Sequence, residues 1–330
     1  MAEISRAEES ILQSLADSVE IDIKQQNPLA DFLEKGFTGI AWGAALVAAS
    51  MLFLITWRVS LDAWPAIQEF GPGFFFGREW VTDDDTFGAL VFVYGTLISA
   101  GLGISLAILL GVAVAILTSE DLVPIYIRRP IAFLVELLAA IPSVIVGLWG
   151  VNVLIPASMP FQNFLFSNFK WLPIFNSEPI GQSLLAAGMV LAVMVVPTIA
   201  AVGRESLLAV PPELRSASMG LGATRWETVF KIQVRTALSG IIGGVMLALG
   251  RALGETMAVA FVIGSTIQIS PSLLDAGYSI PVVLANEFGE AISKLHIGAL
   301  MYLSLILFAI TLVVNVAALL LVQLVSIKSR

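Results

Sequence analysis

The chain of 330 residues contains no cysteine and a single histidine, His296. The first absence excludes disulfides, thiol catalysis and sulfur-ligated metal sites, and one histidine leaves no zinc site of the usual kind. Charge is also scarce: Asp, Glu, Lys and Arg make up 13% of the residues, whereas hydrophobic residues make up 58%. A water-soluble fold cannot hide so much apolar surface. The composition therefore argues against a soluble enzyme, a nucleic-acid-binding protein and a disordered chain, and it predicts an integral membrane protein.

Long apolar runs cover about half of the chain and contain only three charged residues, Glu136, Arg251 and Glu255. About 20 apolar residues suffice for one bilayer crossing, and strict alternation of the kind found in a membrane β-barrel is not evident. The sequence therefore predicts an all-α membrane protein in which a tail, 1–36, precedes a transmembrane domain, 37–327. Its six predicted spans are 37–57, 87–118, 131–155, 180–203, 237–267 and 297–327.

Basic residues are divided unevenly between the predicted loops. If both termini are cytoplasmic, twelve Lys and Arg residues lie inside and four lie outside, as the positive-inside rule requires. The first apolar run begins only at Phe37 and no small-residue cleavage pattern follows it, so we expect it to stay as a membrane anchor. In the tail, Ile11, Leu15 and Val19 predict an amphipathic helix among acidic residues, which favours a partner protein over a lipid surface.

A basic connection of 32 residues, 204–235, separates the fourth and fifth predicted spans. Pro211-Pro212 is typical of a helix start, so we expect a short helix at 213–219 that ends at Gly220 and Gly222. Thr224 and Glu227 form a capping-box pattern that predicts a second helix. Such a loop could be a simple connector, and DNA binding is improbable for a membrane loop, so we interpret it as a docking surface for a cytoplasmic protein. We call residues 204–235 the coupling loop.

The coupling loop resembles the EAA loop of ABC-importer permeases, whose consensus is E-A-A-x-x-x-G followed by I-x-L-P. Here the first part reads Ser216-Ala217-Ser218 with Gly222, and the second reads Ile232-Gln233-Val234-Arg235. Ser216 thus replaces the consensus glutamate, for which Glu213, one turn earlier, is a candidate substitute. The resemblance implies that an ATPase subunit contacts Glu213, Arg215, Ser216, Ala217, Ser218, Met219, Gly220, Gly222 and Thr224.

Two of the three intramembrane charges, Arg251 and Glu255, are spaced i, i+4, so a continuous helix would place them on one face and within reach of each other. A charge at the centre of a membrane helix costs about 2.5–3.5 kcal/mol, so both must face protein or water. They form either a structural ion pair or part of a translocation path. In the second case Arg251 contacts an anion, and Glu255 competes with the anion for Arg251. The bidentate guanidinium suits a phosphate-like oxyanion. Glu136 is a weaker third candidate for this path.

Two motifs narrow the resemblance further. Residues 250–258 (GRALGETMA) and 141–150 (IPSVIVGLWG) resemble the PstC-type permease subunits of phosphate ABC importers, and 76–80 (FGREW) is similar to the same family. The resemblance implies the MetI-like fold of type I ABC importers and a location in the bacterial inner membrane. It also implies a PstA-like sister permease, a PstB-like ATPase dimer and a PstS-like periplasmic phosphate-binding protein as partners.

None of the six lysines follows a glycine, so the Gly-Lys of a Walker A loop is missing. We therefore expect that this chain is not itself an enzyme and holds no cofactor, and that ATP and magnesium bind to the partner ATPase. The expected function is phosphate permeation by alternating access, in contact with membrane lipid and without nucleic acid. A permease for another oxyanion, such as sulfate or molybdate, and a secondary transporter or channel are the alternatives.

Overall fold

The computed structural model describes residues 28–120 and 122–328, and within them the side chains of residues 36–120 and 122–320. The amphipathic helix predicted around Ile11, Leu15 and Val19 lies outside the described residues. The chain divides into two units, Met1–Arg58 and Val59–Arg330. Helix α2 (Pro28–Phe70) begins in the first unit and ends in the second, which contains all of the other described elements.

The described chain is almost entirely helical, which confirms the all-α prediction. After α2, the helices are α3 (Leu90–Ser119), α4 (Ile125–Ala140), α5 (Ser143–Trp149), α6 (Ile155–Phe169), α7 (Leu184–Leu208), α8 (Pro212–Gly220), α9 (Arg225–Glu227), α10 (Val234–Thr236), α11 (Leu238–Leu253), α12 (Met257–Val262), α13 (Ile280–Glu287) and α14 (Lys294–Lys328). Short 3-10 or π turns are η1 (Gly71–Phe75), η2 (Gly150–Leu154), η3 (Pro173–Phe175) and η4 (Thr228–Gln233). Strands β1 (Trp80–Val81) and β2 (Thr86–Phe87) form an antiparallel hairpin.

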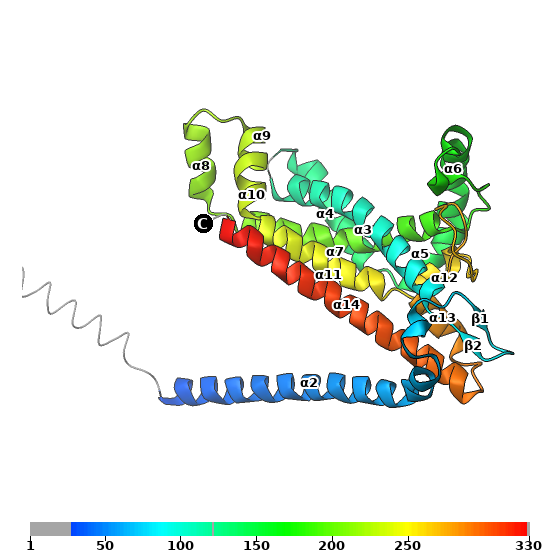
Figure 1. Cartoon of the computed structure of the whole chain (residues 1–330). Coiled ribbons are helices and arrows are strands. Elements are labelled where there is room, and N and C mark those ends of the chain that lie inside the picture. The colour runs from blue at the N-terminus through cyan, green and yellow to red at the C-terminus, as the bar shows by residue number, and fades with distance from the viewer. Residues whose placement is uncertain (1–27, 121, 329–330) are drawn as a thin grey trace, which may run out of the picture. The chain divides into compact units, whose positions relative to one another are not determined.

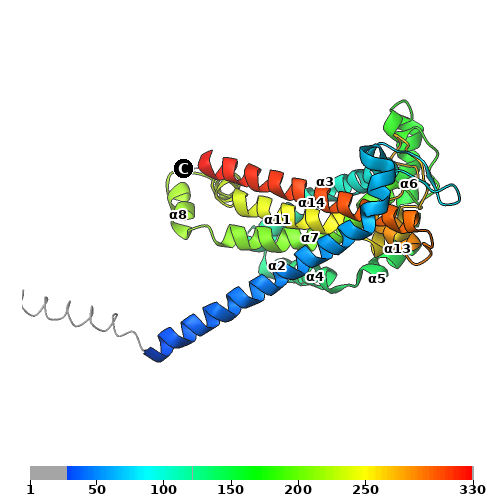
Figure 2. The same ribbon diagram turned by 60° about the horizontal axis from the view of Figure 1, so that its bottom comes forward.

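Helix α7 is the centre of the second unit, and most of its side chains are buried. It packs along α3 on one side and along α11 on another, and α14 lies beside α11 (Figures 1 and 2). Glycines allow the contact between α3 and α7: a Cβ atom at Gly103 would lie 2.6 Å from Cβ of Leu191, and one at Gly188 would lie 2.6 Å from Cβ of Leu102. Small residues at such crossings are the usual means of close packing between membrane helices.

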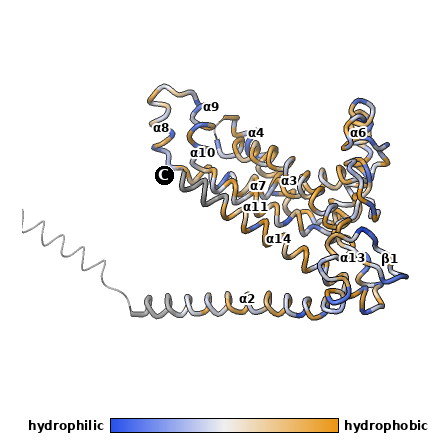
Figure 3. The backbone as a smooth tube through the Cα atoms, viewed as in Figure 1, coloured by the Kyte–Doolittle hydropathy of each residue, from blue (hydrophilic) through white to orange (hydrophobic). Residues whose placement is uncertain are grey.

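The hydrophobic residues run along the long helices, whereas the β1–β2 hairpin is hydrophilic (Figure 3). Five helical segments in the described part of the chain are long and apolar enough to cross a membrane, namely Gly36–Phe75, Leu90–Ser119, Ser143–Phe169, Leu184–Leu208 and Lys294–Leu320. A sixth arises if Arg225–Thr236 and Leu238–Leu253, which meet at an angle of 66°, count as one span. The structure is therefore compatible with the six crossings that the sequence predicts.

The third predicted span, 131–155, is not one helix. Helix α4 ends at Ala140, Ile141 is extended, and α5 begins at Ser143. Pro142 causes this break, because proline has no N–H to donate and disfavours a helical conformation in the residue before it. The apolar helical segment lies instead at Ser143–Phe169, and α4 is a separate helix, so the boundaries of the prediction are corrected here.

The fifth predicted span, 237–267, is also interrupted. Helix α11 ends at Leu253, Gly254 caps it, and the short helix α12 follows from Met257. Beyond α12, Gly264 adopts a positive φ of 91°, which favours glycine and turns the chain into an irregular loop. Only the first half of the predicted span is therefore a regular helix.

The coupling loop and the hairpin lie at opposite ends of the second unit (Figure 1). Helices α8, α9 and α10 protrude at one end, and β1, β2 and α13 lie at the other. Near the hairpin, Trp80, Phe87 and Phe92 pack edge to face, and the buried ring of His296 stacks on Phe87. The bundle thus separates a protruding helical end from an aromatic end along its long helices.

Candidate functional site

The coupling loop folds into two short helical segments joined by a glycine turn, as the sequence predicts. Helix α8 starts with Pro212 in its first turn and ends at Gly220. The N–H of Gly222 donates to the carbonyl of Met219 (3.0 Å), and Gly222 has a φ of 89°. Only glycine adopts this conformation without strain, so this residue fixes the direction in which the chain leaves α8.

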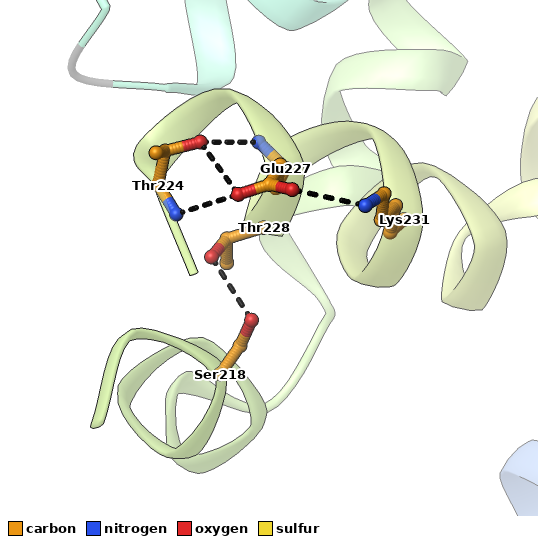
Figure 4. A network of polar contacts seen from close by, with 5 residues as sticks. All are labelled: Ser218, Thr224, Glu227, Thr228 and Lys231. Carbon is orange, nitrogen blue, oxygen red and sulfur yellow. Dashed lines mark hydrogen bonds and ion pairs between the residues drawn. The ribbon is translucent and has the colours of Figure 1, made fainter. Parts of the chain in front are cut away.

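A capping box opens the second helical segment, and Figure 4 shows its contacts. The backbone N–H of Thr224 donates to a carboxylate oxygen of Glu227 (3.0 Å), and the N–H of Glu227 donates to Oγ1 of Thr224 (3.3 Å). Lys231 lies 3.0 Å from the other carboxylate oxygen. The backbone hydrogen bond from Thr224, followed by the contact with Lys231, lowers the pKa of Glu227 to about 2. The predicted capping box is confirmed.

A side-chain hydrogen bond joins the two segments of the coupling loop. The hydroxyl groups of Ser218 on α8 and Thr228 on η4 lie 3.0 Å apart (Figure 4), and Thr228 is buried. Ser218 occupies the third position of the E-A-A pattern, and its hydroxyl points toward Thr228 of the second helical segment. The residue therefore supports the shape of the loop from within.

The outer surface of the coupling loop carries large apolar side chains. Leu221 is 91% exposed, and the stacked rings of Trp226 and Phe230, 5.9 Å apart, are more than half exposed. Glu213 and Ser216 are exposed on α8. Exposed aromatic and aliphatic groups gathered at the end of a loop are typical of protein–protein contact surfaces.

Arg215 points back toward the bundle. Its Nη1 atom lies 3.1 Å from Oε2 of Glu120, a residue at the end of α3 whose side chain is only 3% exposed. Sequence reasoning missed Glu120; the available signal was an acidic residue directly after a long apolar run. The contact makes Arg215 a link between the coupling loop and a membrane helix.

The predicted proximity of Arg251 and Glu255 is not observed. Because α11 ends at Leu253, Glu255 lies beyond the helix, and its Oε1 atom accepts a hydrogen bond from the N–H of Ala258 (3.4 Å) at the start of α12. Within the described residues no ion pair joins Arg251 to Glu255. The i, i+4 argument fails because it assumed a continuous helix.

Arg251 is exposed and lines a cavity of about 770 Å³ between α7, α11 and α14. Its polar neighbours in the lining are Thr198, Thr311 and Asn315, and the glycines Gly243 and Gly250 leave the wall of α11 open. The cavity therefore offers one cation and three uncharged hydrogen-bonding groups within a mostly apolar surface.

Glu136 is not part of the same cavity. It is exposed on α4 and lines a separate space of about 150 Å³ between α3, α4 and α7, together with Arg204 and Glu205. The three intramembrane charges therefore occupy three different surroundings. No group of three or more His, Cys, Asp or Glu residues that could hold a metal ion occurs in the described part of the chain.

Comparisons with known proteins place the chain among transport permeases. The family described as "Binding-protein-dependent transport system inner membrane component" matches residues 107–328. A "Phosphate transport system permease protein PstC" of Xylella fastidiosa is 40% identical over 279 residues, covering 83% of this chain and 84% of that protein. A PstC of Haemophilus influenzae is 41% identical and covers 81% of this chain and 86% of its own. A probable PstC of the archaeon Methanocaldococcus jannaschii is 32% identical over 85% and 90%.

Solved structures share the fold. A chain of a bacterial ABC transporter "involved in the import of the acidic polysaccharide alginate" matches with a TM-score of 0.53 and 16% identity, covering 88% of this chain and 98% of that one. A chain of the MetNI methionine ABC transporter in an inward-facing conformation matches with a TM-score of 0.52 and 18% identity, covering 71% and 96%. These likenesses support the MetI-like permease architecture.

Proposed function

This chain belongs to the family of inner membrane components of binding-protein-dependent transport systems, in its PstC phosphate-permease branch, and from this premise we propose that it forms one half of a phosphate translocation path. It is a multi-pass membrane protein of an ABC importer, whose relatives are permeases and not enzymes. The identity of about 40% over more than four fifths of the chain is the observation that carries the choice of phosphate over sulfate or molybdate.

Arg251 is the proposed contact for the anion. A guanidinium at the end of a membrane helix, exposed to a cavity and without an acidic partner in the described residues, can donate two parallel hydrogen bonds to an oxyanion. Thr198 and Asn315 line the same cavity and could complete the contacts that a tetrahedral oxyanion needs.

Glu255 is the proposed partner of Arg251 in a second conformation. The two residues lie on either side of the break at Gly254, so a straightened helix would restore their i, i+4 contact. The broken state leaves the guanidinium open to an anion, and the continuous state would occupy it. Such an exchange of partners would link anion binding at Arg251 to the conformational change of alternating access. Glu136 remains a weaker candidate, on helix α4, which packs against α3 and α7.

The coupling loop is the proposed contact with an ATPase that binds ATP and magnesium. Its exposed apolar side chains supply a docking surface, and the contact between Arg215 and Glu120 connects α8 to α3. The other proposed partners are a PstA-like sister permease and a PstS-like periplasmic phosphate-binding protein, with a PstB-like dimer as the ATPase. Both termini are proposed to be cytoplasmic, in the bacterial inner membrane.

The test is phosphate uptake by proteoliposomes that contain the complete transporter. Arg251→Gln should abolish uptake while the subunits still co-purify, and Arg251→Lys should restore only part of it because lysine cannot make the bidentate contact. Lys170→Gln removes a positive charge from an exposed position outside both the coupling loop and the cavity, and it serves as the control. Uptake unchanged in Arg251→Gln would make the residue structural.

Two further measurements separate the alternatives. Competition by sulfate or molybdate as strong as that by unlabelled phosphate would indicate another oxyanion importer. A secondary transporter or channel would purify without a nucleotide-binding subunit. If an ATPase does co-purify, Gly222→Val should release it, because a β-branched residue does not tolerate the positive φ of this turn.

A further inference from the structure

Three arginines line a third cavity, which the proposed transport path does not use. This space of about 300 Å³ lies where the ends of α3 and α7 meet the first turns of α4. Arg128 and Arg129 of α4 and Arg204 of α7 line it, together with Thr118 and Ser119 of α3, and among the described residues no acidic side chain lines it. It shares no lining residue with the cavity around Arg251.

Two of the guanidinium groups, those of Arg204 and Arg129, have hydrogen-bond donors without a partner among the described residues. The Nε atom of Arg204 is buried and has no hydrogen-bond partner within the described residues. An unpaired buried donor is unfavourable, so we expect another group to complete its hydrogen bond. Arg129 is exposed and forms no hydrogen bond or ion pair with the described part of the chain. Arg128 donates to the backbone carbonyl of Glu120 (3.3 Å), which holds its side chain at this place.

The two hydroxyl groups of the cavity already donate their protons to backbone carbonyls of α3, so the arginines are its main hydrogen-bond donors. The hydroxyl of Thr118 donates to the carbonyl of Val114 (2.7 Å), and that of Ser119 donates to the carbonyl of Ile116 (3.3 Å). Helix α4 begins at Ile125 without a side-chain cap, so its first N–H groups add a partial positive charge to the guanidinium groups. The cavity is therefore suited to a ligand that carries negative charge and several acceptor oxygens.

Acidic side chains line the neighbouring space. The smaller space that contains Glu136 and Glu205 also has Arg204 in its lining. Arg204 therefore lines both spaces, the one that contains Glu136 and Glu205 and the one that contains Arg128 and Arg129. Glu136 and Glu205 line the space on one side of Arg204, and Arg128 and Arg129 line the space on the other.

We propose that this cavity binds a phosphate group, either as free inorganic phosphate or as the headgroup of an anionic phospholipid. Several arginines and a helix N-terminus together match the oxygens of a phosphate group. Its volume is about ten times the share of a water molecule in the liquid, roughly 30 Å³, which leaves room for a phosphate group. The site adjoins the coupling loop, because Arg128 holds the backbone of Glu120 and Arg215 holds its side chain.

The test uses the full-length chain carrying Arg251→Gln, so that the proposed transport site does not contribute. Binding of radiolabelled inorganic phosphate is measured in detergent, and retention of phosphatidylglycerol against phosphatidylcholine is measured by native mass spectrometry. Arg204→Gln should weaken binding of one probe by about tenfold or more, since charge-assisted hydrogen bonds are lost. Arg129→Gln should act in the same direction, and its exposed, unpaired position makes misfolding no explanation.

Arg235→Gln is the matched control, because it removes the same charge from an exposed position outside the cavity. A selective loss of phosphate binding identifies the free anion as the ligand, and a selective loss of phosphatidylglycerol identifies the headgroup. Equal behaviour of the Arg204, Arg129 and Arg235 variants with both probes, including a failure of both to bind, overturns the proposal.

Discussion

Arg215 on the coupling loop and Glu120 at the end of α3 are 3.1 Å apart, although 95 positions separate them in the sequence. The carboxylate is 3% exposed and the guanidinium side chain 32% exposed, so the two partners depend on the contact to different extents. The buried carboxylate has little access to water, whereas the arginine can turn outward. This asymmetry makes the contact testable.

Arg215→Gln should destabilise the protein by about 3 kcal/mol, because it leaves a buried carboxylate without its cation. Glu120→Gln should cost less than about 1 kcal/mol, because the remaining arginine reaches solvent. Thermal unfolding of the purified protein measures both, with Arg225→Gln as an exposed control from the same loop. Equal effects of the two substitutions would show that the contact is not the source of the difference.

Close packing of α3 on α7 predicts unequal effects of two neighbouring glycines. A Cβ atom at Gly103 would lie 2.6 Å from Cβ of Leu191, whereas a Cβ atom at Gly101 meets nothing within 4 Å. Gly103→Ala should therefore destabilise the protein by about 1–3 kcal/mol through overpacking. Gly101→Ala should be neutral or slightly stabilising, by up to about 1 kcal/mol, because alanine favours the helix. Unfolding midpoints in the same detergent compare the two, and a similar loss in both would contradict the predicted packing.

The capping box should respond to acid. The pKa of Glu227 is lowered from 4.5 to about 2 by the hydrogen bond from Thr224 and by Lys231. Because the folded value lies below the unfolded one, the stabilisation is complete above about pH 4.5 and is lost as the pH falls toward 2. A bimane label on Phe230→Cys, in a chain without other cysteines, reports fraying through quenching by Trp226.

Glu227→Gln provides the control for that titration, because a glutamine side chain does not ionise in this range. The quenching should change between pH 4.5 and pH 2 in the parent chain and stay flat in the variant. The same titration in both would assign the change to another group.

The orientation prediction can be tested with single cysteines, since the natural chain has none. Asp84→Cys in the hairpin turn should react with a membrane-impermeant maleimide applied to intact spheroplasts. Ser216→Cys on the coupling loop should react only after permeabilisation. The two positions lie at opposite ends of the second unit, on the hairpin and on α8. Reversed labelling would place the coupling loop outside and exclude its contact with a cytoplasmic ATPase.

Much of the structure of the coupling loop could be predicted from local sequence, because helix starts, turns and caps depend on residues a few positions apart. Pro212 starts α8, Gly222 supplies the positive φ of the turn, and Thr224 with Glu227 forms the capping box. The prediction of a membrane protein needs no tertiary contacts either, because it depends only on the hydropathy of consecutive residues. Family motifs correctly indicated the PstC relationship.

The boundaries of the membrane spans and the pairing of charged residues could not be predicted from local sequence patterns. Hydropathy does not distinguish a continuous helix from two helices that meet at Pro142, so the predicted span 131–155 joined parts of separate helices. For the same reason the spacing of Arg251 and Glu255 predicted a pair that the break at Gly254 separates.

By itself the sequence determined that the chain is a mostly helical membrane protein with a structured coupling loop, because apolar content, turn residues and caps act locally, and its motifs indicated a permease through family resemblance. Only the tertiary structure decided which charged groups meet: Arg215 with buried Glu120, Arg251 with an open cavity, and three arginines around a space between α3, α4 and α7. Such neighbours depend on where helices break and how closely they pack. Those outcomes arise from contacts between distant segments, which no local pattern encodes.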